Sequence, residues 1–371
     1  MKFIDLHAQQ DRIRPQLDAA IARVLDHGQF VMGPEVSEFE AVLRDYTQAP
    51  HALTCANGTD ALLLVLKAWG IGAGDAVFCP AFTFVATAEV VAMLGATPVF
   101  VDIKRDTYTV CPESLSRAIQ ETQQSDTLTP RALITVDLFG QPANYPVIAD
   151  ICQRENVKLI ADSAQSFGCR LQDEHPLKWA DAMTTSFFPA KPLGCYGDGG
   201  ALMAHEDALA ETIDSLRIHG KGTDKYDNVR IGLNSRLDSL QAAILLEKMK
   251  VFDAELASRS RIAGIYSEAL KDKVSRVPTI IDGGTSTWAI YTIEVPDRER
   301  FTRIMGEAGI PTPAYYPKPL HRQTAYCHYP ISGNALVNTD EAAEHVVSLP
   351  MHPYLSESDQ ARVIETACRA L

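Results

Sequence analysis

The sequence lacks several features that mark particular classes of protein. No two of its eight cysteines have Cys-x-x-Cys spacing, and their wide separation is typical of reduced thiols rather than of a disulfide framework. Basic residues are outnumbered, with Lys plus Arg at 34 against 47 for Asp plus Glu, and the formal net charge is −13. This acidity opposes non-specific binding to nucleic acid or to an anionic membrane. The chain also has no internal repeat, no low-complexity tract and no pair of histidines with the spacing of a metal site.

Long apolar segments are also missing. The most apolar window spans residues 84–101 with Glu89 as its only charge, but Gly95 and Pro98 divide it into a helix-like half and a strand-like half. We therefore expect a buried helix that leads into a strand, not a membrane span. Residues 1–7 contain Lys, Asp and His where a signal peptide needs an apolar stretch. Together these features predict a soluble, cytoplasmic protein.

What is present is the composition of an ordinary globular protein, with 46% hydrophobic and 22% charged residues. From about Gly58 to Ala204, helix-like and strand-like segments alternate, which predicts a mostly parallel sheet covered by helices. The strand-like segments are continuous apolar runs, as expected for strands that are buried on both faces. Strands are predicted at 76–79, 98–101, 132–136 and 157–161, and helices at 61–69, 86–94 and 145–155.

After about Ser235 the pattern changes. Apolar residues at helical spacing predict a long helix over 237–256. The remaining segments predict a smaller α+β unit, with strands at 288–295 and 311–316 and a helix at 298–308. We therefore expect a large α/β domain over residues 1–250 and a small C-terminal domain over residues 251–371, hinged near residue 250.

Two residues of the large domain are candidates for chemistry. Asp162 directly follows the predicted strand 157–161, so its carboxylate stands at the carboxyl end of a parallel strand, where open α/β sheets bind ligands. A structural helix-capping aspartate is the alternative. Lys191 lies between prolines in the apolar stretch 184–194, where loss of hydration lowers the pKa of a lysine and frees its amine as a nucleophile. An ordinary surface lysine is the alternative here.

Two glycine-containing segments bear on whether this domain binds a phosphate group or a dinucleotide. The segment 57–60 (Asn-Gly-Thr-Asp) begins a predicted helix, and free amides at a helix N-terminus beside a hydroxyl can bind phosphate. Simple N-capping explains the same residues. The glycines of 194–201 predict a tight turn and hairpin, and they do not form the Gly-x-Gly-x-x-Gly fingerprint of a nicotinamide dehydrogenase. A phosphate cradle, a strand-end carboxylate and a desolvated lysine in one domain are what pyridoxal 5′-phosphate (PLP) requires.

Seven ordered motifs also resemble a known family, the DegT/StrS-type sugar-nucleotide aminotransferases, which are PLP enzymes of fold type I. The resemblance covers nearly the whole chain. It implies a mostly parallel seven-stranded sheet covered by helices, with a smaller α+β C-terminal domain. The motifs stand at residues 33–36, 56–62, 82–87, 162–168, 186–191, 234–238 and 316–321.

The resemblance implies roles around the cofactor ring. Lys191 would hold PLP covalently as a Schiff base, and Asp162 would keep the pyridine nitrogen protonated. Phe84 would stack on the ring, and Gln165 would bond the oxygen of its 3-hydroxyl group. Pyridoxamine phosphate would be the intermediate form of the cofactor.

The resemblance also implies how the phosphate is held. The backbone amides of Gly58 and Thr59 would bind it together with the hydroxyls of Thr59 and Ser186. In the family, the residue that matches Asn234 reaches the phosphate from a neighbouring subunit. A homodimer with shared active sites is therefore implied by resemblance.

The basic residues of this acidic chain gather in two places. Some of them, Arg230 in particular, would bind a nucleotide diphosphate or a sugar carboxylate, and a solvated charged loop is the alternative. In the second group, His321 and the preceding Tyr316 belong to a loop that lies near the sugar in the family. The first group runs from Arg217 to Arg236 with His219, Lys221, Lys225 and Arg230 between, and the second contains Lys318, His321 and Arg322.

The family's activity is the transfer of an amino group from a donor, L-glutamate in relatives, to a keto-sugar nucleotide. The turn 197–200 (Gly-Asp-Gly-Gly) resembles members that aminate C3. Residues 186–200 in combination with 348–354 resemble a subgroup acting on UDP-2-acetamido-2-deoxy-3-oxo-D-glucuronate in bacterial O-antigen assembly, part of lipopolysaccharide biosynthesis. C4 amination of a 4-keto-6-deoxy sugar nucleotide is an alternative, and so is a non-catalytic regulator on the same fold. The family's dehydratases carry histidine in place of the lysine, so Lys191 argues against that class.

Overall fold

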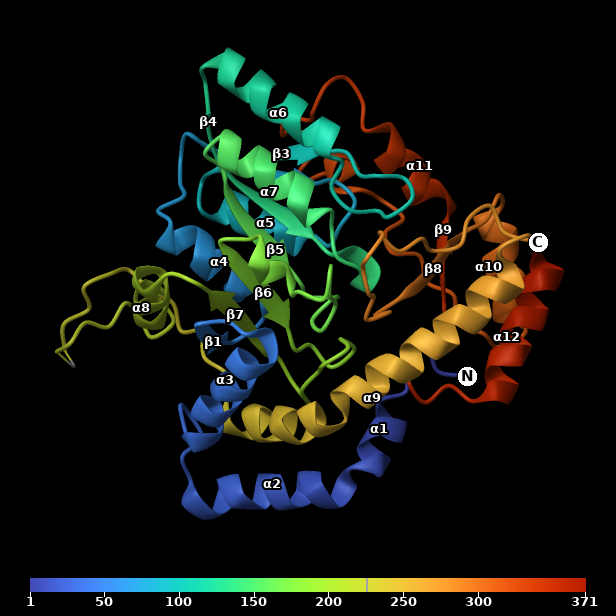
Figure 1. The fold of residues 1–371 in the computed structure, drawn as a ribbon, viewed down its shortest axis with the longest axis horizontal. Coiled ribbons are helices and arrows are strands. Elements are labelled where there is room, and N and C mark those ends of the chain that lie inside the picture. The colour runs from blue at the N-terminus through green and yellow to red at the C-terminus, as the bar shows by residue number, and fades with distance from the viewer. Residues whose placement is uncertain (225) are drawn as a thin grey trace.

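The computed structural model describes residues 1–224 and 226–371, and a seven-stranded sheet forms the centre of its large domain (Figure 1). The strand order is β1-β7-β6-β5-β4-β2-β3. Only β7 runs antiparallel to its neighbours in this sheet, so the predicted mostly parallel sheet is confirmed. The strands are β1 His51–Cys55, β2 Asp75–Pro80, β3 Thr97–Val101, β4 Thr129–Val136, β5 Lys158–Asp162, β6 Ala182–Ser186 and β7 Gly200–Ala204.

Helices cover both faces of this sheet, which explains why its strands are apolar on both sides. In β5, Leu159 and Ala161 pack in the core formed with α3, α6, α7 and α9 (Ser239–Leu270), whereas Ile160 packs in the core formed with α4, α5 and α8. The helices before α9 are α1 Leu6–Arg12, α2 Arg14–His27, α3 Pro34–Thr47, α4 Gly58–Ala68, α5 Ala86–Met93, α6 Pro112–Ser125, α7 Tyr145–Arg154 and α8 Asp207–Leu216, with short 3₁₀ turns at Leu138–Gly140 and Pro176–Lys178.

The long helix α9, Ser239–Leu270, passes from one domain to the other (Figure 1). Phe252 in its first half lies in the core of the large domain, and Tyr266 in its second half lies in the core of the small domain. The helix extends well beyond the predicted end at residue 256. Buried charged residues such as Arg259 interrupt its apolar stripe, which concealed the continuation. The predicted division at residue 250 falls within this helix, and a hinge between domains 1–250 and 251–371 stays a proposal.

The small domain is built on a two-stranded antiparallel sheet of β8, Tyr291–Glu294, and β9, Val346–Leu349. The predicted strand at 311–316 is wrong. These residues belong to neither sheet, and two prolines among them lack the N–H groups that a ladder needs. The second strand is instead the short apolar run 346–349. The remaining elements are α10 Arg298–Glu307, a 3₁₀ turn at Leu320–Arg322, α11 Val337–His345 and α12 Glu357–Ala370.

The apolar window 84–101 consists of α5 and β3, the helix and strand expected from its glycine and proline. In the part of the chain that the structure describes, no helix combines the length and apolarity that a membrane crossing requires.

Candidate active site

A cavity of about 380 Å³ opens where the parallel strands end, which we call the carboxyl edge of the sheet. Asp162 closes β5, Ser186 closes β6, and Asn57–Thr59 follow β1, so three segments distant in sequence meet there. Lys191 enters the cavity from the loop between β6 and β7. The carboxyl ends of the strands in such sheets are the usual place for a ligand site. The fold therefore brings together Lys191, Asp162 and the segment 57–59.

The start of α4 forms one wall of the cavity. Asn57 caps the helix by accepting a hydrogen bond from the amide of Asp60 (2.8 Å), which confirms the N-capping interpretation for one amide. The other amides of the first turn have no acceptor within the helix, and the helix dipole makes this end partly positive. A Cβ on Gly58 would lie 2.7 Å from the Cβ of Ser186, so glycine is required for this close approach. The arrangement is a cradle for an anion of phosphate size, with the Ser186 hydroxyl beside it.

Lys191 and Asp162 affect each other's protonation. Burial lowers the pKa of Lys191, and the nearby Asp162 carboxylate opposes this effect only in part. Burial raises the pKa of Asp162, against the effects of a hydrogen bond from the amide of Ala164 (3.0 Å) and of the Lys191 charge. The lysine is thus nearer to its nucleophilic, neutral form than an exposed lysine, and the alternative of an ordinary surface lysine does not fit.

Gln165 and two aromatic residues form another wall of the cavity. The side-chain oxygen of Gln165 accepts from the amide of Phe139 (2.8 Å), and its amide nitrogen lies 3.3 Å from the hydroxyl oxygen of Tyr316. Phe84 is 53% exposed although it is a large apolar side chain, and its ring lies 6.3 Å from that of Tyr316. An aromatic face exposed to a cavity is available for stacking against a planar ligand.

A buried carboxylate that the sequence did not single out supports this wall from beneath. Asp137 is fully buried and accepts hydrogen bonds from the amide of Ala143 (2.8 Å) and the hydroxyls of Tyr145 (2.8 Å), Ser166 (2.9 Å) and Ser163 (3.2 Å). Two of these donors belong to the segment that follows Asp162, so Asp137 holds that segment in place. The available signal was its position directly after the strand 129–136, which parallels the position of Asp162 after β5.

Comparison with known proteins identifies the family. Residues 11–367 match the DegT/DnrJ/EryC1/StrS aminotransferase family. The chain belongs to this aminotransferase family. It is 44% identical, over 100% of its length and 99% of the relative, to the UDP-2-acetamido-2-deoxy-3-oxo-D-glucuronate aminotransferase of Pseudomonas aeruginosa.

Solved structures agree with this membership. The chain resembles a DegT DnrJ EryC1 StrS aminotransferase from Brucella abortus with a TM-score of 0.97 and 49% identity, covering 99% of this chain and 98% of the other. It also resembles NtdA from Bacillus subtilis with bound cofactor PMP, with a TM-score of 0.87 and 30% identity, covering 99% and 83%. The predictions of an aminotransferase, of its fold type I architecture and of PLP as cofactor are therefore confirmed.

The residues at the carboxyl edge of this aminotransferase fit the cofactor. The cradle at Gly58 and Thr59 suits its phosphate, and a second close approach supports it: a Cβ on Gly200 would lie 2.4 Å from the backbone of Asn57. The lysine of lowered pKa and the buried carboxylate lie on the same cavity, as a Schiff base and a protonated ring nitrogen require. The individual cofactor contacts of Lys191 and Asp162 stay predictions until a complex is measured.

Three predicted contacts do not line this cavity. Arg230 and Asn234 are exposed on the segment that joins α8 to α9, which projects from the body of the large domain (Figure 1). His321 is buried, with its Nε2 atom 3.1 Å from Asp340, and burial lowers its pKa. Their assignments stay predictions. Lys225, which the sequence grouped with Arg230, lies outside the described residues.

Some cavity residues had not been expected from the sequence. Phe3 and Ile4 reach the cavity from the N-terminus, and the carbonyl of Phe3 accepts from the amide of Met351 (3.2 Å). Asp198, which the sequence used only as a sign of C3 chemistry, also lines it. No local pattern could reveal Phe3, because its partner stands near the other end of the chain.

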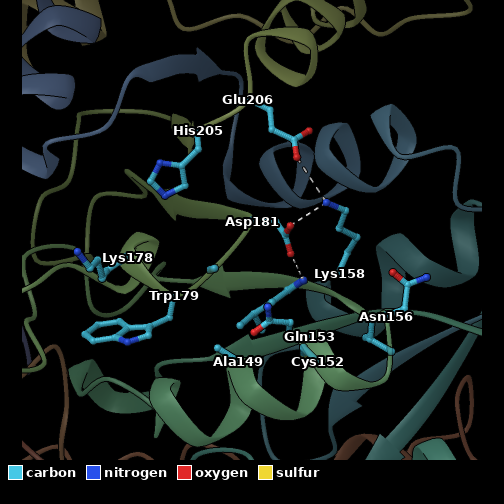
Figure 2. Close-up of a pocket in the computed structure, with 13 residues that line it drawn as sticks. Ala149, Cys152, Gln153, Asn156, Lys158, Lys178, Trp179, Asp181, His205 and Glu206 are labelled. Carbon is cyan, nitrogen blue, oxygen red and sulfur yellow. Dashed lines mark hydrogen bonds and ion pairs between the residues drawn. The ribbon is translucent and has the colours of Figure 1, made fainter.

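A second cavity of about 380 Å³ lies where β5 and β6 begin, which we call the amino edge (Figure 2). Its charged groups are paired: Lys158 lies 2.8 Å from Asp181 and 3.6 Å from Glu206. Burial would lower the pKa of Lys158, but these two carboxylates outweigh burial and raise it. His205 is also engaged, with Nε2 2.9 Å from the carbonyl oxygen of Leu177. This cavity shows no group poised for chemistry.

Proposed function

We propose that this aminotransferase moves an amino group from L-glutamate to C3 of a UDP-2-acetamido-3-keto-glucuronate-like sugar nucleotide, in the cytoplasm, for bacterial surface polysaccharide such as O-antigen. The observation that carries the proposal is the meeting of Lys191, Asp162 and the phosphate cradle on one cavity. The Pseudomonas relative supports the sugar and the C3 position, as does Asp198 in the cavity wall. The eight cysteines are unpaired, which supports a reducing compartment.

The protein residues would share the chemistry as follows. When bound, PLP supplies an electron sink for the carbon that loses its proton. Lys191 would hold the cofactor through Nζ and, once released, would move a proton from the donor's α-carbon, for which its lowered pKa favours the neutral amine. Asp162 would keep a proton on the ring nitrogen. Phe84 would stack on the ring, and Gln165, fixed by Phe139, would bond the ring hydroxyl oxygen.

A sugar nucleotide needs more positive charge than one copy of the cavity offers. Among the described residues that line it, Lys191 is the single cation, and Asp162 and Asp198 are acidic. A diphosphate and a glucuronate carboxylate call for cationic partners. Arg230, with Lys221 and His219, is exposed on the segment between α8 and α9 and lines no part of its own cavity.

We therefore propose a homodimer in which that segment of a second copy completes the site. This segment exposes apolar side chains that a partner subunit would cover: Ile231 is 86% exposed and Val229 is 54% exposed. Phe30 and Val31, 47% and 49% exposed, lie next to the start of α9, where Phe30 accepts from the amide of Ser239 (2.9 Å). Exposed apolar groups of this size are typical of an interface. Asn234 would then reach the phosphate of the partner's cofactor, and Arg230 would reach the substrate.

The test is a half-reaction. The purified enzyme is converted with glutamate to its pyridoxamine phosphate form, mixed with a panel of 3-keto and 4-keto sugar nucleotides, and followed by the return of PLP absorbance. We expect rapid return with a 3-keto UDP-glucuronate. Return with 4-keto-6-deoxy sugars alone would favour C4 amination. No return with any sugar, in a protein that still binds PLP, would favour a regulatory role.

A further inference from the structure

A second buried lysine contacts the loop that carries Lys191. Lys248, on α9, is 1% exposed, and its Nζ donates a hydrogen bond to the carbonyl oxygen of Gly194. The same Nζ lies 4.2 Å from the ring centroid of Tyr196, so the ammonium is held between a carbonyl and an aromatic face. Burial lowers the pKa of Lys248 to about 8, against the charge of Glu255. No step of the proposed chemistry uses this residue.

The loop that Lys248 contacts, residues 187–197, makes close contacts between its own two limbs. The amide of Lys191 donates to the carbonyl of Phe188 (2.8 Å). A Cβ on Gly194 would lie 2.5 Å from the carbonyl oxygen of Pro189 and 2.7 Å from that of Phe188, so the two limbs of the loop touch at this glycine. A displacement of Gly194 would therefore carry the limb that bears Lys191 with it.

Helix α9 holds this loop at two points. Besides the bond from Lys248, Gln241 accepts a hydrogen bond from the amide of Tyr196 (2.8 Å). The base of the loop is closed by a bond from the amide of Cys195 to the carbonyl of Phe187 (2.8 Å). The attachment is therefore made of polar contacts in a region that is otherwise apolar and buried.

Stability alone does not account for a lysine in this position. Removing an ammonium from water costs free energy, and a buried ion pair replaced as a whole by apolar residues of similar volume commonly loses no stability. The balancing carboxylate, Glu255, is itself fixed by Gln9 (2.9 and 2.8 Å) and by the hydroxyl of Tyr354. A buried lysine and a buried glutamate thus lie on the same helix, and the lysine is the one that contacts the Lys191 loop.

We propose that Lys248 is a positioning residue, which holds Gly194 and thereby sets the place of Lys191 against Asp162. The inference rests on the proposed role of Lys191 as the residue that holds the cofactor. Lys248 acts through the backbone of the loop and touches no reacting atom.

The test compares Lys248→Met with Lys250→Met. Lys250 lies on the same helix, but its side chain is 67% exposed and paired with Glu247 (2.6 Å), so it is a matched control. In the cofactor-free protein, we expect amide hydrogen exchange in residues 187–197 to be about tenfold faster in Lys248→Met and unchanged in the control. Gln9, Tyr354 and the charge of Arg259 still stabilise the Glu255 carboxylate in Lys248→Met, so its melting temperature should stay within about 3 °C of the parent protein.

The same variants are then loaded with PLP. For Lys248→Met we expect kcat to fall about tenfold with little change in the KM for glutamate, since a small misplacement of the lysine reduces rate more than binding. The pH at which the absorbance of bound PLP is half-way through its pH-dependent change should differ between Lys248→Met and the parent protein. Tyr196→Leu, which keeps Lys248 but removes the aromatic face, should change exchange and rate in the same direction to a smaller extent, and it tests the proposal even if Lys248→Met does not fold.

Two results would overturn the proposal. One is a Lys248→Met or Tyr196→Leu protein whose loop exchange and PLP absorbance match the control. The other is a loss of melting temperature in step with the loss of rate, which would assign Lys248 a purely structural role. Failure of the proposed role of Lys191 would look different, because Lys191→Ala would then retain PLP absorbance whatever the loop exchange showed.

Discussion

The two edges of the central sheet carry cavities of equal volume and opposite character. At the carboxyl edge, Lys191 has a lowered pKa and shares its cavity with the buried carboxylate of Asp162. At the amino edge, Lys158 is paired with Asp181 and Glu206, and its pKa is raised. Cavity size therefore does not mark the site in this protein. The site is marked instead by buried ionisable groups whose charges are not fully balanced by neighbouring residues. A bound cofactor and substrate can supply the missing partners.

The largest expected difference between the edges concerns the lysines themselves. Lys191→Ala should lower transamination by about 10⁴-fold or more and abolish the PLP absorbance that borohydride bleaches, because the amine is both anchor and base. Lys158→Ala should keep both within about twofold, since its charge serves partly exposed ion pairs and a contact with the ring of Trp69, away from the carboxyl edge. Absorbance spectra and steady-state rates of the two variants check this. A Lys191→Ala enzyme that still transaminates would contradict the assignment.

The second largest difference is expected between the carboxylates at the two edges, Asp162 and Asp181. Asp162→Asn should reduce kcat by about 10²-fold while leaving the covalent PLP absorbance in place, because a neutral amide does not keep the ring nitrogen protonated. Asp181→Asn at the amino edge should change stability by about 1 kcal/mol through its bond to the amide of Leu159 (2.8 Å) and leave kcat nearly unchanged. Rates and thermal melts of the two proteins separate these outcomes. Near-normal turnover of Asp162→Asn would remove that residue from its role.

A smaller effect is expected from reversing the charge of an exposed cation. Arg230→Glu should raise the KM for the sugar nucleotide about tenfold with little change in the KM for glutamate, since it would remove one charged contact to the substrate. Lys178→Glu, at the amino edge, is the matched charge reversal and should change neither constant. An unchanged sugar-nucleotide KM in Arg230→Glu would favour the solvated-loop interpretation.

The smallest effect is a difference in titration between Lys191 and Lys158. Only the neutral amine is acylated, so a lowered pKa moves the onset of labelling to lower pH and a raised pKa moves it to higher pH. In the cofactor-free protein, the pH midpoint for labelling of Lys191 should therefore lie below that of Lys158. Acylation across a pH series, read by peptide mass spectrometry, gives both midpoints. The reverse order would show that the carboxyl edge does not desolvate its lysine.

The sequence predicted the sheet and the main chemistry for identifiable reasons. Buried parallel strands appear as apolar runs, so the end of 157–161 could be located and Asp162 with it. Lys191 was visible because prolines and apolar residues surround it in the chain itself. Prediction failed at 311–316, where the proline-containing backbone makes one bond to β9, from the amide of Ser348 to the carbonyl of Pro313 (2.9 Å), but forms no ladder with it. The short run 346–349 gave too weak a pattern to be recognised as a strand.

Residues that act through distant contacts were beyond sequence reasoning. Phe3 reaches the cavity through a bond from Met351, and Asp137 acts through hydroxyls that follow Asp162. Lys248 stood within a predicted helix, but nothing in its neighbours indicated that its ammonium is buried against Gly194.

The sequence by itself thus determined the fold type, the family and the residue types needed for PLP chemistry, because these depend on local patterns and ordered motifs. Only the tertiary structure decided which charges share a cavity and which are paired with carboxylates. Two lysines at opposite edges of the same sheet have pKa values shifted in opposite directions, because burial and ion pairing depend on neighbours brought together by folding, and sequence spacing does not record them.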